Sequence, residues 1–309
     1  MLPIYFAPIQ GFTDDVYRRV HHKIAGGVEC YYTPFVRVEV GSIRSKDVRD
    51  IAPDNNNGVP VVPQIIFNSR KEFEFLVNRV EALGYKQIDL NMGCPFPLQA
   101  RHKRGSGILS HPDIVESIIE GIKEHETLQF SVKMRLGWDN NSECERIIEL
   151  LNNIDIQHIT LHPRTGQQQY KGSVDMEKFR YVYEMSRNPI IYNGDIQSLD
   201  DIRKLGQEFP CLKGVMIGRG LLGCPSMAIE YQQQNEWTTS QRIALMLDIH
   251  NSLMDEYSHI LHGDTQMLNK MRTFWEYAES LLGRKPYKKI MKSGNLKNYL
   301  IAVNELKLL

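Results

Sequence analysis

Residues 88–97 read IDLNMGCPFP. The apolar start of this stretch predicts a short buried strand, and the Asn-x-Gly that follows ends the strand abruptly. Cys94 then lies between a glycine and a proline, where the chain turns away from the strand. The stretch therefore predicts a strand whose C-terminal end presents a thiol.

Apolar, β-rich runs of this kind recur along the chain, and most of the segments between them have helical periodicity. Residues 69–84, for example, begin with Ser69 as an N-cap and place their apolar residues on one face. Strands that alternate with helices indicate parallel β–α units. The expected strands are at residues 4–8, 28–33, 59–67, 87–91, 130–135, 158–162, 189–193 and 214–218.

Eight such units within about 220 residues predict an α/β fold, a closed (β/α)8 or TIM barrel. An open doubly wound sheet is the alternative, but no Gly-x-Gly-x-x-Gly follows the first strand. From residue 238 onward the strands stop and only helical stretches follow. We therefore expect a barrel domain at residues 1–237 and an all-α C-terminal helical domain at residues 238–309.

The composition argues against several classes of protein. Lys+Arg and Asp+Glu both number 37, so the net charge favours no partner and any basic surface has to be local. No apolar run is long enough for a transmembrane helix, and the N-terminal stretch lacks the features of a signal peptide, so we expect a cytoplasmic protein. The five cysteines include no Cys-x-x-Cys pair, which argues against a disulfide framework or a metal site.

In a barrel, chemistry takes place where the strands end at their C-terminal edge. A single polar residue at such a position is weak evidence for function. A lone histidine at a strand end, for example, is more often a hydrogen-bonded structural residue than a catalyst. The occurrence of many such residues at one rim predicts a functional site. The strand-end residues are Gln10, Gln64, Asn91, Cys94, Lys133, Arg135, His162, Arg164, Asn193, Asp195 and Arg219.

Glycine occurs at the ends of the last two expected strands. Gly194 directly follows the strand that ends at Asn193, and Gly218 is the last residue of the strand at 214–218. Barrels commonly bind phosphate at these loops through exposed backbone N–H groups, and Arg219 adds a forked donor. Gln64 can both donate to and accept from an amide-like ring edge. Because Lys133 can place a positive charge beside a ring that becomes anionic on reduction, these features favour FMN over a sugar phosphate.

The chain contains seven motifs, in this order: APIQGFTD (7–14), DLNMGCPFP (89–97), GSGILSHP (105–112), VKMRLGWD (132–139), LHPRTGQQQYKG (161–172), NGDI (193–196) and MIGRGLLGCP (216–225). In this order they resemble the tRNA-dihydrouridine synthases, a family of FMN-dependent reductases. TPFVRV (33–38) and RLGWD (135–139) most resemble the bacterial branch that modifies uridine 16 of the tRNA D-loop.

The resemblance implies that Cys94 is catalytic and that NADPH is the electron donor. The chain departs from the family at Pro163, where a glycine is usual, and proline removes a backbone donor beside His162. The flavin contacts that the resemblance implies are Pro8, Ile9, Gln10, Gln64, Lys133, His162, Asn193, Gly194, Asp195, Gly218 and Arg219.

Cys94 has the chemistry that such a reduction needs. When a hydride from reduced FMN reaches C6 of a uracil ring, C5 needs a proton from the opposite face. A thiol with its ordinary pKa of about 8.5 is protonated at neutral pH and can act as this general acid. Asn91 matches a uracil edge, Arg135 can bind a carbonyl oxygen or a phosphate, and the base has to be extruded from the tRNA.

Basic residues after the cysteine and in the helical tail are candidates for contact with tRNA phosphates. A solvated helix face explains the tail cluster equally well. The main candidates are Arg101, Lys103, Arg104, Arg272, Lys288 and Lys289, with Lys270, Arg284, Lys285, Lys292 and Lys297 nearby. Four aromatic residues among them either stack on bases or belong to the core: Trp275, Tyr277, Tyr287 and Tyr299.

Three functions are compatible with these features. The first is a tRNA uridine reductase, which we expect to be a monomer that uses FMN and NADPH. The second is an FMN barrel oxidoreductase for a small pyrimidine such as dihydroorotate, against which the basic tail argues. The third is an RNA-binding protein without catalysis, against which the set of Cys94, Lys133 and His162 argues.

Overall fold

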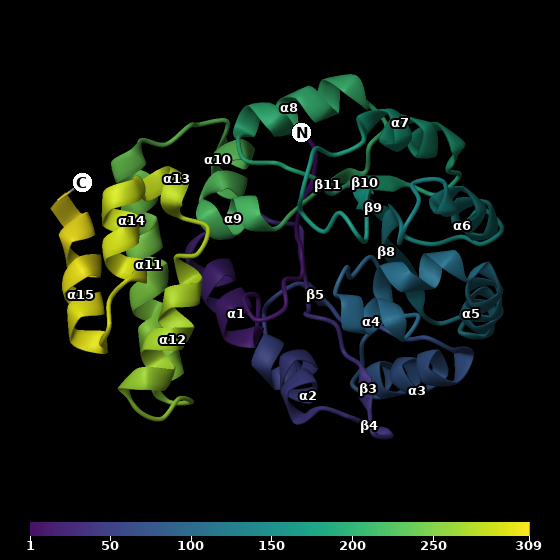
Figure 1. Ribbon diagram of the computed structural model, residues 1–309, viewed down its shortest axis with the longest axis horizontal. Helices are drawn as coiled ribbons and strands as arrows, with labels where there is room; N and C mark the ends of the chain where they lie inside the picture. Colours follow the sequence, from purple (N-terminus) through teal and green to yellow (C-terminus); the bar gives the residue numbers. More distant parts are fainter. Residues whose placement is uncertain (309) are drawn as a thin grey trace.

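The protein, described over residues 1–308 by a computed structural model, contains one parallel sheet that curves into a barrel (Figure 1). The strand order is β5-β2-β1-β11-β10-β9-β8-β7-β6. The predicted barrel and the helical region that follows it are confirmed. The strands are β1 (Ile4–Phe6), β2 (Cys30–Tyr32), β5 (Val61–Val62), β6 (Gln64–Ile65), β7 (Gln87–Met92), β8 (Gln129–Gly137), β9 (Ile159–Thr165), β10 (Ile190–Tyr192) and β11 (Gly214–Ile217).

Pro63 explains why nine strands occupy eight barrel positions. β5 pairs with β2, β6 pairs with β7, and Pro63 alone separates β5 from β6 in the chain. Because proline has no N–H to donate, the strand is interrupted there, while the Pro63 carbonyl oxygen still accepts from the Asp89 amide at 2.9 Å. The two short strands together form the third strand predicted at residues 59–67 and close the barrel.

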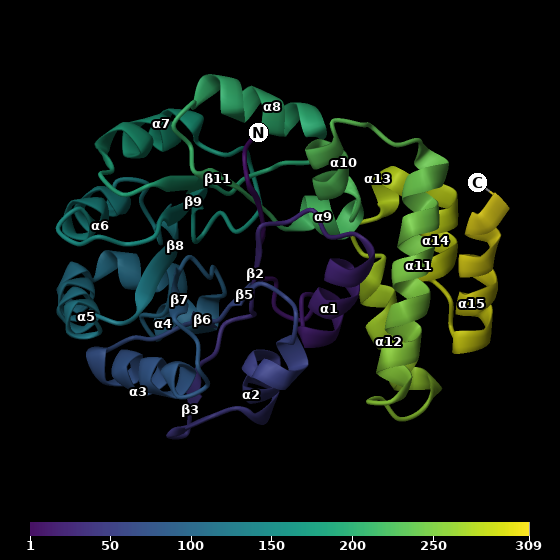
Figure 2. The same cartoon turned by 180° about the vertical axis from the view of Figure 1, so that it is seen from behind.

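Helices cover the outside of the barrel (Figures 1 and 2). The predicted N-cap of α3 is confirmed, since the Ser69 hydroxyl accepts from the Glu72 amide at 3.4 Å. The helices of this part are α1 (Asp15–Ile24), α3 (Arg70–Glu81), α4 (Pro97–Arg101), η2 (Gly105–Ser110), α5 (Pro112–Glu124), α6 (Glu143–Leu151), α7 (Met176–Met185), α8 (Leu199–Glu208), α9 (Arg219–Gly223) and α10 (Met227–Gln233).

The segment between β2 and β5 contains elements that the sequence analysis did not predict. β3 (Val38–Glu39) and β4 (Ser42–Ile43) form a small antiparallel hairpin, followed by α2 (Ser45–Ile51) and η1 (Pro53–Asn56). The turn places Val40 at a φ of 49° and Gly41 at a φ of 76°. Strands of two residues are too short to produce an alternating pattern, so periodicity could not reveal this hairpin.

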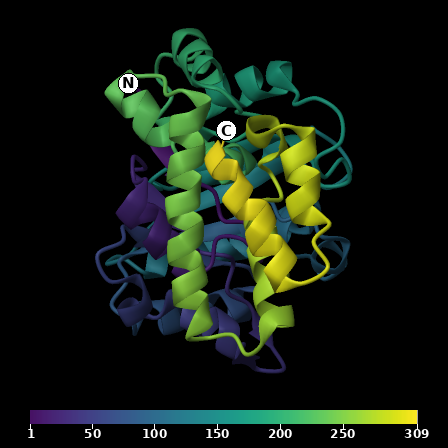
Figure 3. The same cartoon turned by 90° about the vertical axis from the view of Figure 1, so that its left-hand side faces the viewer.

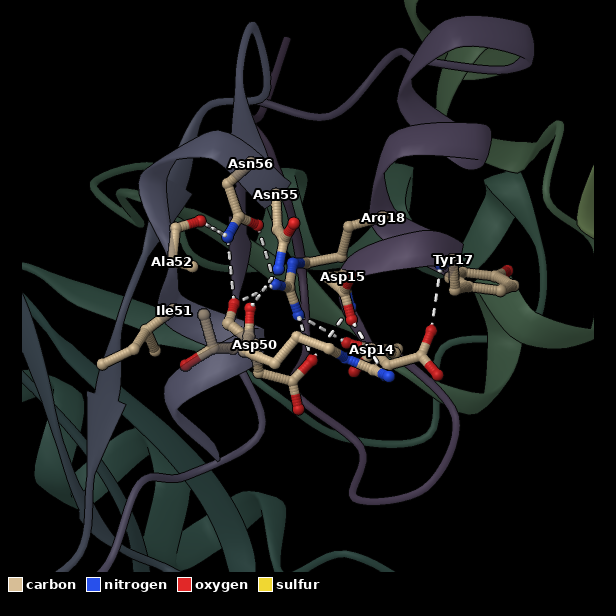
Figure 4. Close-up of polar contacts among 12 residues, drawn as sticks. Asp14, Asp15, Tyr17, Arg18, Asp50, Ile51, Ala52, Asn55 and Asn56 are labelled. Carbon is tan, nitrogen blue, oxygen red and sulfur yellow. Dashed lines mark hydrogen bonds and ion pairs between the residues drawn. The ribbon is translucent and has the colours of Figure 1, made fainter. Parts of the chain in front are cut away.

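A buried arginine joins this segment to the loop after β1 (Figure 4). The guanidinium of Arg18 donates to the carbonyl oxygens of Thr13 at 2.7 Å and Asp50 at 2.6 Å, and to Asn56 Oδ1 at 2.7 Å. The Asp50 carboxylate accepts from the Asp15 amide at 2.9 Å. Because a buried charge needs partners of this kind, the network fixes Thr13 and the start of α1 against residues 50–56.

The C-terminal helices pack on one side of the barrel, against α1 and α9 (Figures 1 and 3). Their core contains Trp275 and Tyr299, since Trp275 Nε1 donates to the Tyr299 hydroxyl at 2.8 Å and both side chains are fully buried. These two aromatic residues therefore belong to the core. The helices are α11 (Thr239–Ser258), α12 (Asp264–Phe274), α13 (Glu279–Leu282), α14 (Arg284–Met291), α15 (Leu296–Asn304) and η3 (Glu305–Leu308).

Candidate active site

A cleft of about 330 Å³ opens at the C-terminal ends of the barrel strands, a volume within the range of small-molecule sites. Asn91, Cys94 and Arg135 line it together with residues from the other loops of this rim. Of the expected flavin contacts, only Asp195 lies outside the lining. Those within it are Pro8, Ile9, Gln10, Gln64, Lys133, His162, Asn193, Gly194, Gly218 and Arg219.

Cys94 lies in a turn that is fixed by hydrogen bonds to the side chain of Asn91. Asn91 Oδ1 accepts from the backbone N–H of Gly93 at 3.1 Å and of Cys94 at 2.9 Å. On the other side, the Cys94 carbonyl oxygen accepts from the amide and the hydroxyl of Ser106, at 3.0 Å and 2.9 Å. Burial raises the pKa of the Cys94 thiol above its ordinary value, so that the thiol keeps its proton at neutral pH.

Lys133 brings a positive charge from β8 into the cleft. Its Nζ donates to Asn193 Oδ1 at 2.6 Å, and Asn193 Nδ2 donates to the Met216 carbonyl oxygen at 2.7 Å. Burial, followed by the charge of Arg135, lowers the pKa of Lys133 to about 8. The ammonium group is therefore charged at neutral pH, and an anionic group placed beside it would raise this pKa.

Asp195 links two arginines at the rim formed by β9, β10 and β11. Arg164 Nη1 donates to Asp195 Oδ1 at 3.0 Å, and Arg219 Nη2 donates to the same oxygen at 2.8 Å. The hydrogen bond from Arg164, with the charges of both arginines, lowers the pKa of Asp195 despite its partial burial. The carboxylate therefore orients the Arg219 guanidinium, which lines the cleft.

His162 is a neutral imidazole of defined tautomer. Burial, reinforced by the charge of Arg135 and of other nearby cations, holds the pKa of His162 well below its usual range. Its Nε2 lies 3.1 Å from Arg164 Nη1, and an arginine can only donate. The proton of His162 therefore resides on Nδ1.

Arg135 ties the cysteine turn to the loop after β9. Its Nε donates to the Gly93 carbonyl oxygen at 3.0 Å, and its Nη1 donates to those of Thr165 at 2.9 Å and Gln169 at 2.7 Å. Burial lowers its pKa to about 10, so the guanidinium remains charged at neutral pH. Its Nη2 has no hydrogen-bond partner within residues 1–308 and is available to a ligand in the cleft.

Two tyrosines that the sequence analysis did not assign to the cleft also line it. Tyr170 lies over the Arg219 guanidinium, with 4.3 Å from Arg219 Cζ to the ring centroid. Tyr277 comes from the helical region, and its ring lies 5.4 Å from that of Phe12. Tyr170 belongs to the motif at 161–172, whereas no sequence signal places Tyr277, because its position depends on how the helices pack on the barrel.

The basic candidates near the cysteine differ in their partners. Arg101 and Lys103 are exposed at the end of α4 and form no ion pair within residues 1–308. Arg104 is half-buried and forms an ion pair with Glu72. The first two side chains are therefore free to meet a phosphate, whereas Arg104 is engaged within the protein.

The basic candidates of the helical region divide in the same way. Lys288 is exposed and has no ion-pair partner among the described residues, whereas Lys289 pairs with Glu305 at 2.5 Å. Arg272 is half-buried and donates to Asn269 Oδ1 at 3.3 Å. Lys270 forms an ion pair with Asp14 of the barrel at 2.8 Å.

No group of three or more His, Cys, Asp or Glu residues within residues 1–308 could hold a metal ion. In the same part, no helix is both long and apolar enough to cross a membrane.

Sequence comparisons match this chain to known proteins over most of its length. The sequence profile described as "Dihydrouridine synthase (Dus)" matches residues 5–307. The chain is 30% identical to "tRNA-dihydrouridine synthase B" of Pasteurella multocida (strain Pm70) over 223 residues, 72% of this chain and 66% of that protein. It is 31% identical to "tRNA-dihydrouridine(16) synthase" of Neisseria meningitidis serogroup B over 240 residues, 74% of this chain and 71% of that protein.

A solved structure of a morphinone reductase variant in complex with tetrahydroNAD has a similar backbone. The TM-score is 0.53 at 8% sequence identity, over 78% of this chain and 90% of that chain. At this identity the similarity supports the barrel fold alone.

Proposed function

The chain belongs to the dihydrouridine synthase family, and we propose that it is an FMN-dependent oxidoreductase that reduces the C5=C6 bond of a D-loop uridine in tRNA. The observation that carries this proposal is the position of the Cys94 thiol, which lines the same cleft as Gln64 and Lys133. Uridine 16 is the proposed position, since relatives named tRNA-dihydrouridine(16) synthase match this chain. We propose NADPH as the electron donor, a single chain as the active unit and the cytoplasm, where tRNA is found, as its location.

The donors in the cleft fit FMN. The loops that follow β10 and β11 present Gly194, Gly218 and the Arg219 guanidinium, a donor set suited to a phosphate. Lys133 is suited to the edge of a ring that becomes anionic on reduction. Asp195 is an acceptor when ionised, so we propose that it holds Arg219 in place without touching the phosphate itself.

The chemistry divides between the cofactor and Cys94. When bound, FMN supplies the hydride that reaches C6 of the uracil ring. Cys94 donates the proton to C5, because burial keeps the thiol protonated and its turn holds it at the cleft. Arg135 Nη2 is available to bind a carbonyl oxygen of the ring, and Lys133 stays charged at neutral pH.

We propose tRNA contacts at the basic side chains that form no ion pair within residues 1–308. Arg101 and Lys103 lie on the segment that follows Cys94, and Lys288 lies on α14. Arg104 and Lys289 already form ion pairs, so a phosphate would have to compete with Glu72 and Glu305 for them. We therefore rank the unpaired residues first as phosphate contacts.

The proposal is tested by purification and reaction with tRNA. We expect a yellow protein with noncovalent FMN that is reduced by NADPH and reoxidised by tRNA lacking dihydrouridine, with dihydrouridine detected at position 16 by mass spectrometry. Reduction of free uracil or of a dihydroorotate-type substrate without reaction on tRNA would favour the small-pyrimidine enzyme. Absence of flavin after reconstitution would reject a flavoenzyme of either kind.

A further inference from the structure

A buried carboxylate below the cleft has no role in the chemistry described above. Asp89 lies on β7 and is fully buried. Its Oδ2 accepts from Gln64 Nε2 at 2.6 Å, and its Oδ1 accepts from the Ser131 hydroxyl at 2.5 Å. Asp89 does not line the cleft, but its partner Gln64 does.

From Asp89 a chain of hydrogen bonds leads to the cysteine. Gln64 Oε1 accepts from Asn91 Nδ2 at 2.7 Å. Asn91 Oδ1 in turn accepts from the backbone N–H groups of Gly93 and Cys94. A continuous path of hydrogen bonds therefore joins the Asp89 carboxylate to the turn that carries the thiol.

The two ends of this chain determine the orientation of both amides. A carboxylate only accepts hydrogen bonds, and a backbone N–H only donates. Gln64 must therefore point its nitrogen toward Asp89, and Asn91 must point its oxygen toward Cys94. A reversed amide at either position would place two donors or two acceptors against each other in a buried site, which is costly.

We propose that Asp89 is a positioning residue, which sets the turn of Cys94 by fixing the amide orientations of Gln64 and Asn91. This inference deepens the proposed function and rests on it for the meaning of the thiol. It also defines what Asn91 offers to a substrate. Because its oxygen already accepts from two amides, Asn91 presents the second N–H of Nδ2, a donor suited to a carbonyl oxygen of the base.

The substitution Asp89→Asn tests the polarity of the chain while keeping the shape of the side chain. The substitution removes the obligate acceptor at position 89, so the amides of Gln64 and Asn91 are no longer held in one orientation, and the reversed arrangement, which reaches the Cys94 amide, becomes accessible. Ser131→Ala is the matched control, because it removes the other hydrogen bond of the same carboxylate and leaves the polarity intact.

The first readout is single-turnover oxidation of the pre-reduced holoenzyme by tRNA. We expect Asp89→Asn to slow it by about 10- to 100-fold, the scale for a small misplacement of a catalytic group. In an Asn91→Ala background, the same substitution should change the rate by less than about threefold, because the two residues act through one path. The rate losses caused by Ser131→Ala and by Asn91→Ala should multiply in the double variant.

The second readout does not depend on turnover. Alkylation of Cys94 by iodoacetamide, followed by peptide mass spectrometry, should change in rate in Asp89→Asn, while the exposed Cys211 serves as the reference in the same sample. Gln64→Leu breaks the chain at its middle link and should change Cys94 alkylation in the same direction, which keeps the test available if Asp89→Asn fails to fold.

Unchanged Cys94 alkylation, or rate losses from Asp89→Asn and Asn91→Ala that simply multiply, would overturn the inference. A wild-type protein that forms no dihydrouridine would reject the proposed function instead. The alkylation readout would still decide whether Asp89 sets the cysteine turn, so the two failures are distinguishable.

Discussion

Asp89→Asn should change how the stability of the protein depends on pH. Burial is the main cause that raises the pKa of Asp89 from 3.8 to about 6, and the hydrogen bonds from Gln64 and Ser131 offset only part of this effect. At 1.36 kcal/mol per pH unit, this change makes the ionised form less favourable in the folded protein by about 3 kcal/mol.

The sign follows from proton binding. Between pH 3.8 and 6 the folded protein holds a proton on Asp89 that the unfolded chain has lost, so the stability from this group is fully present below about pH 3.8 and is lost as the pH rises to about 6. The amide that replaces the carboxyl group in Asp89→Asn does not titrate in this range. The free energy of unfolding of Asp89→Asn, relative to wild type, should therefore increase by about 2–3 kcal/mol between pH 4 and pH 7.

Urea unfolding followed by far-ultraviolet circular dichroism, with the same excess of FMN in each sample, measures this difference. Ser131→Ala is an informative control, because loss of its hydrogen bond should raise the pKa of Asp89 further and steepen the loss of stability with pH. Lys133, whose charge lowers the pKa of Asp89, itself has a pKa of about 8 and titrates above this window. Parallel pH dependences for wild type and Asp89→Asn would refute the reasoning.

Three further predictions concern the proposed reaction. Cys94→Ala should keep FMN and its reduction by NADPH but slow dihydrouridine formation by about 10²–10⁴, and a wild-type rate of flavin reoxidation by tRNA would mean that another group is the acid. Replacing Lys288 and Lys292 with Met should reduce the slope of log K for tRNA binding against log salt concentration by about 0.7 per lost phosphate contact. Lys289→Met is the control, because Lys289 already pairs with Glu305. Equal slopes in wild type and in the Lys288/Lys292 variant would mean that these lysines only form a solvated helix face. Arg219→Ala should weaken FMN binding by about 1.5–3 kcal/mol in a fluorescence titration, and an unchanged Kd would place the phosphate elsewhere.

The barrel was predictable because its signals are local. Ser69 caps α3 and Pro112 starts α5, and each strand contributes an apolar run between such boundaries. The interruption at Pro63 was not predicted, although a proline within an apolar run indicates that a strand can be interrupted there. Only the pairing of β5 with β2 and of β6 with β7 shows that one predicted strand serves as two.

The family was also predictable, since the seven motifs occur in order and the Dus profile match confirms the resemblance. Relatives named tRNA-dihydrouridine(16) synthase support the same branch. The roles of individual charges were less accessible. A sequence shows that Arg104 and Lys289 are basic, but their partners Glu72 and Glu305 are distant in the chain and are found only in the folded protein.

The helical region also holds part of the barrel rim in place. Tyr257 donates to Asp14 Oδ1 at 2.7 Å, and Lys270 Nζ donates to Asp14 Oδ2 at 2.8 Å and to the Gly11 carbonyl oxygen at 3.3 Å. Asp14 is the N-cap of α1 and follows directly after the loop that lines the cleft. The tail therefore fixes the loop that contains Gln10.

Two kinds of lysine in the tail must therefore be separated in any study of RNA binding. Loss of Lys270 would leave a buried Asp14 carboxylate without its counterion and would disturb the cleft together with the tail, since Tyr277 of the same region also lines the cleft. Loss of Lys288 removes a charge that has no ion-pair partner within residues 1–308, so a loss of tRNA affinity in that variant would report a direct contact with RNA. Tyr277, in the turn between α12 and α13, lines the cleft, and Lys288 lies on α14 of the same helical region. We therefore propose that the packing of this region on the barrel sets the distance between the tRNA phosphates it would bind and Cys94, and with it the choice of uridine.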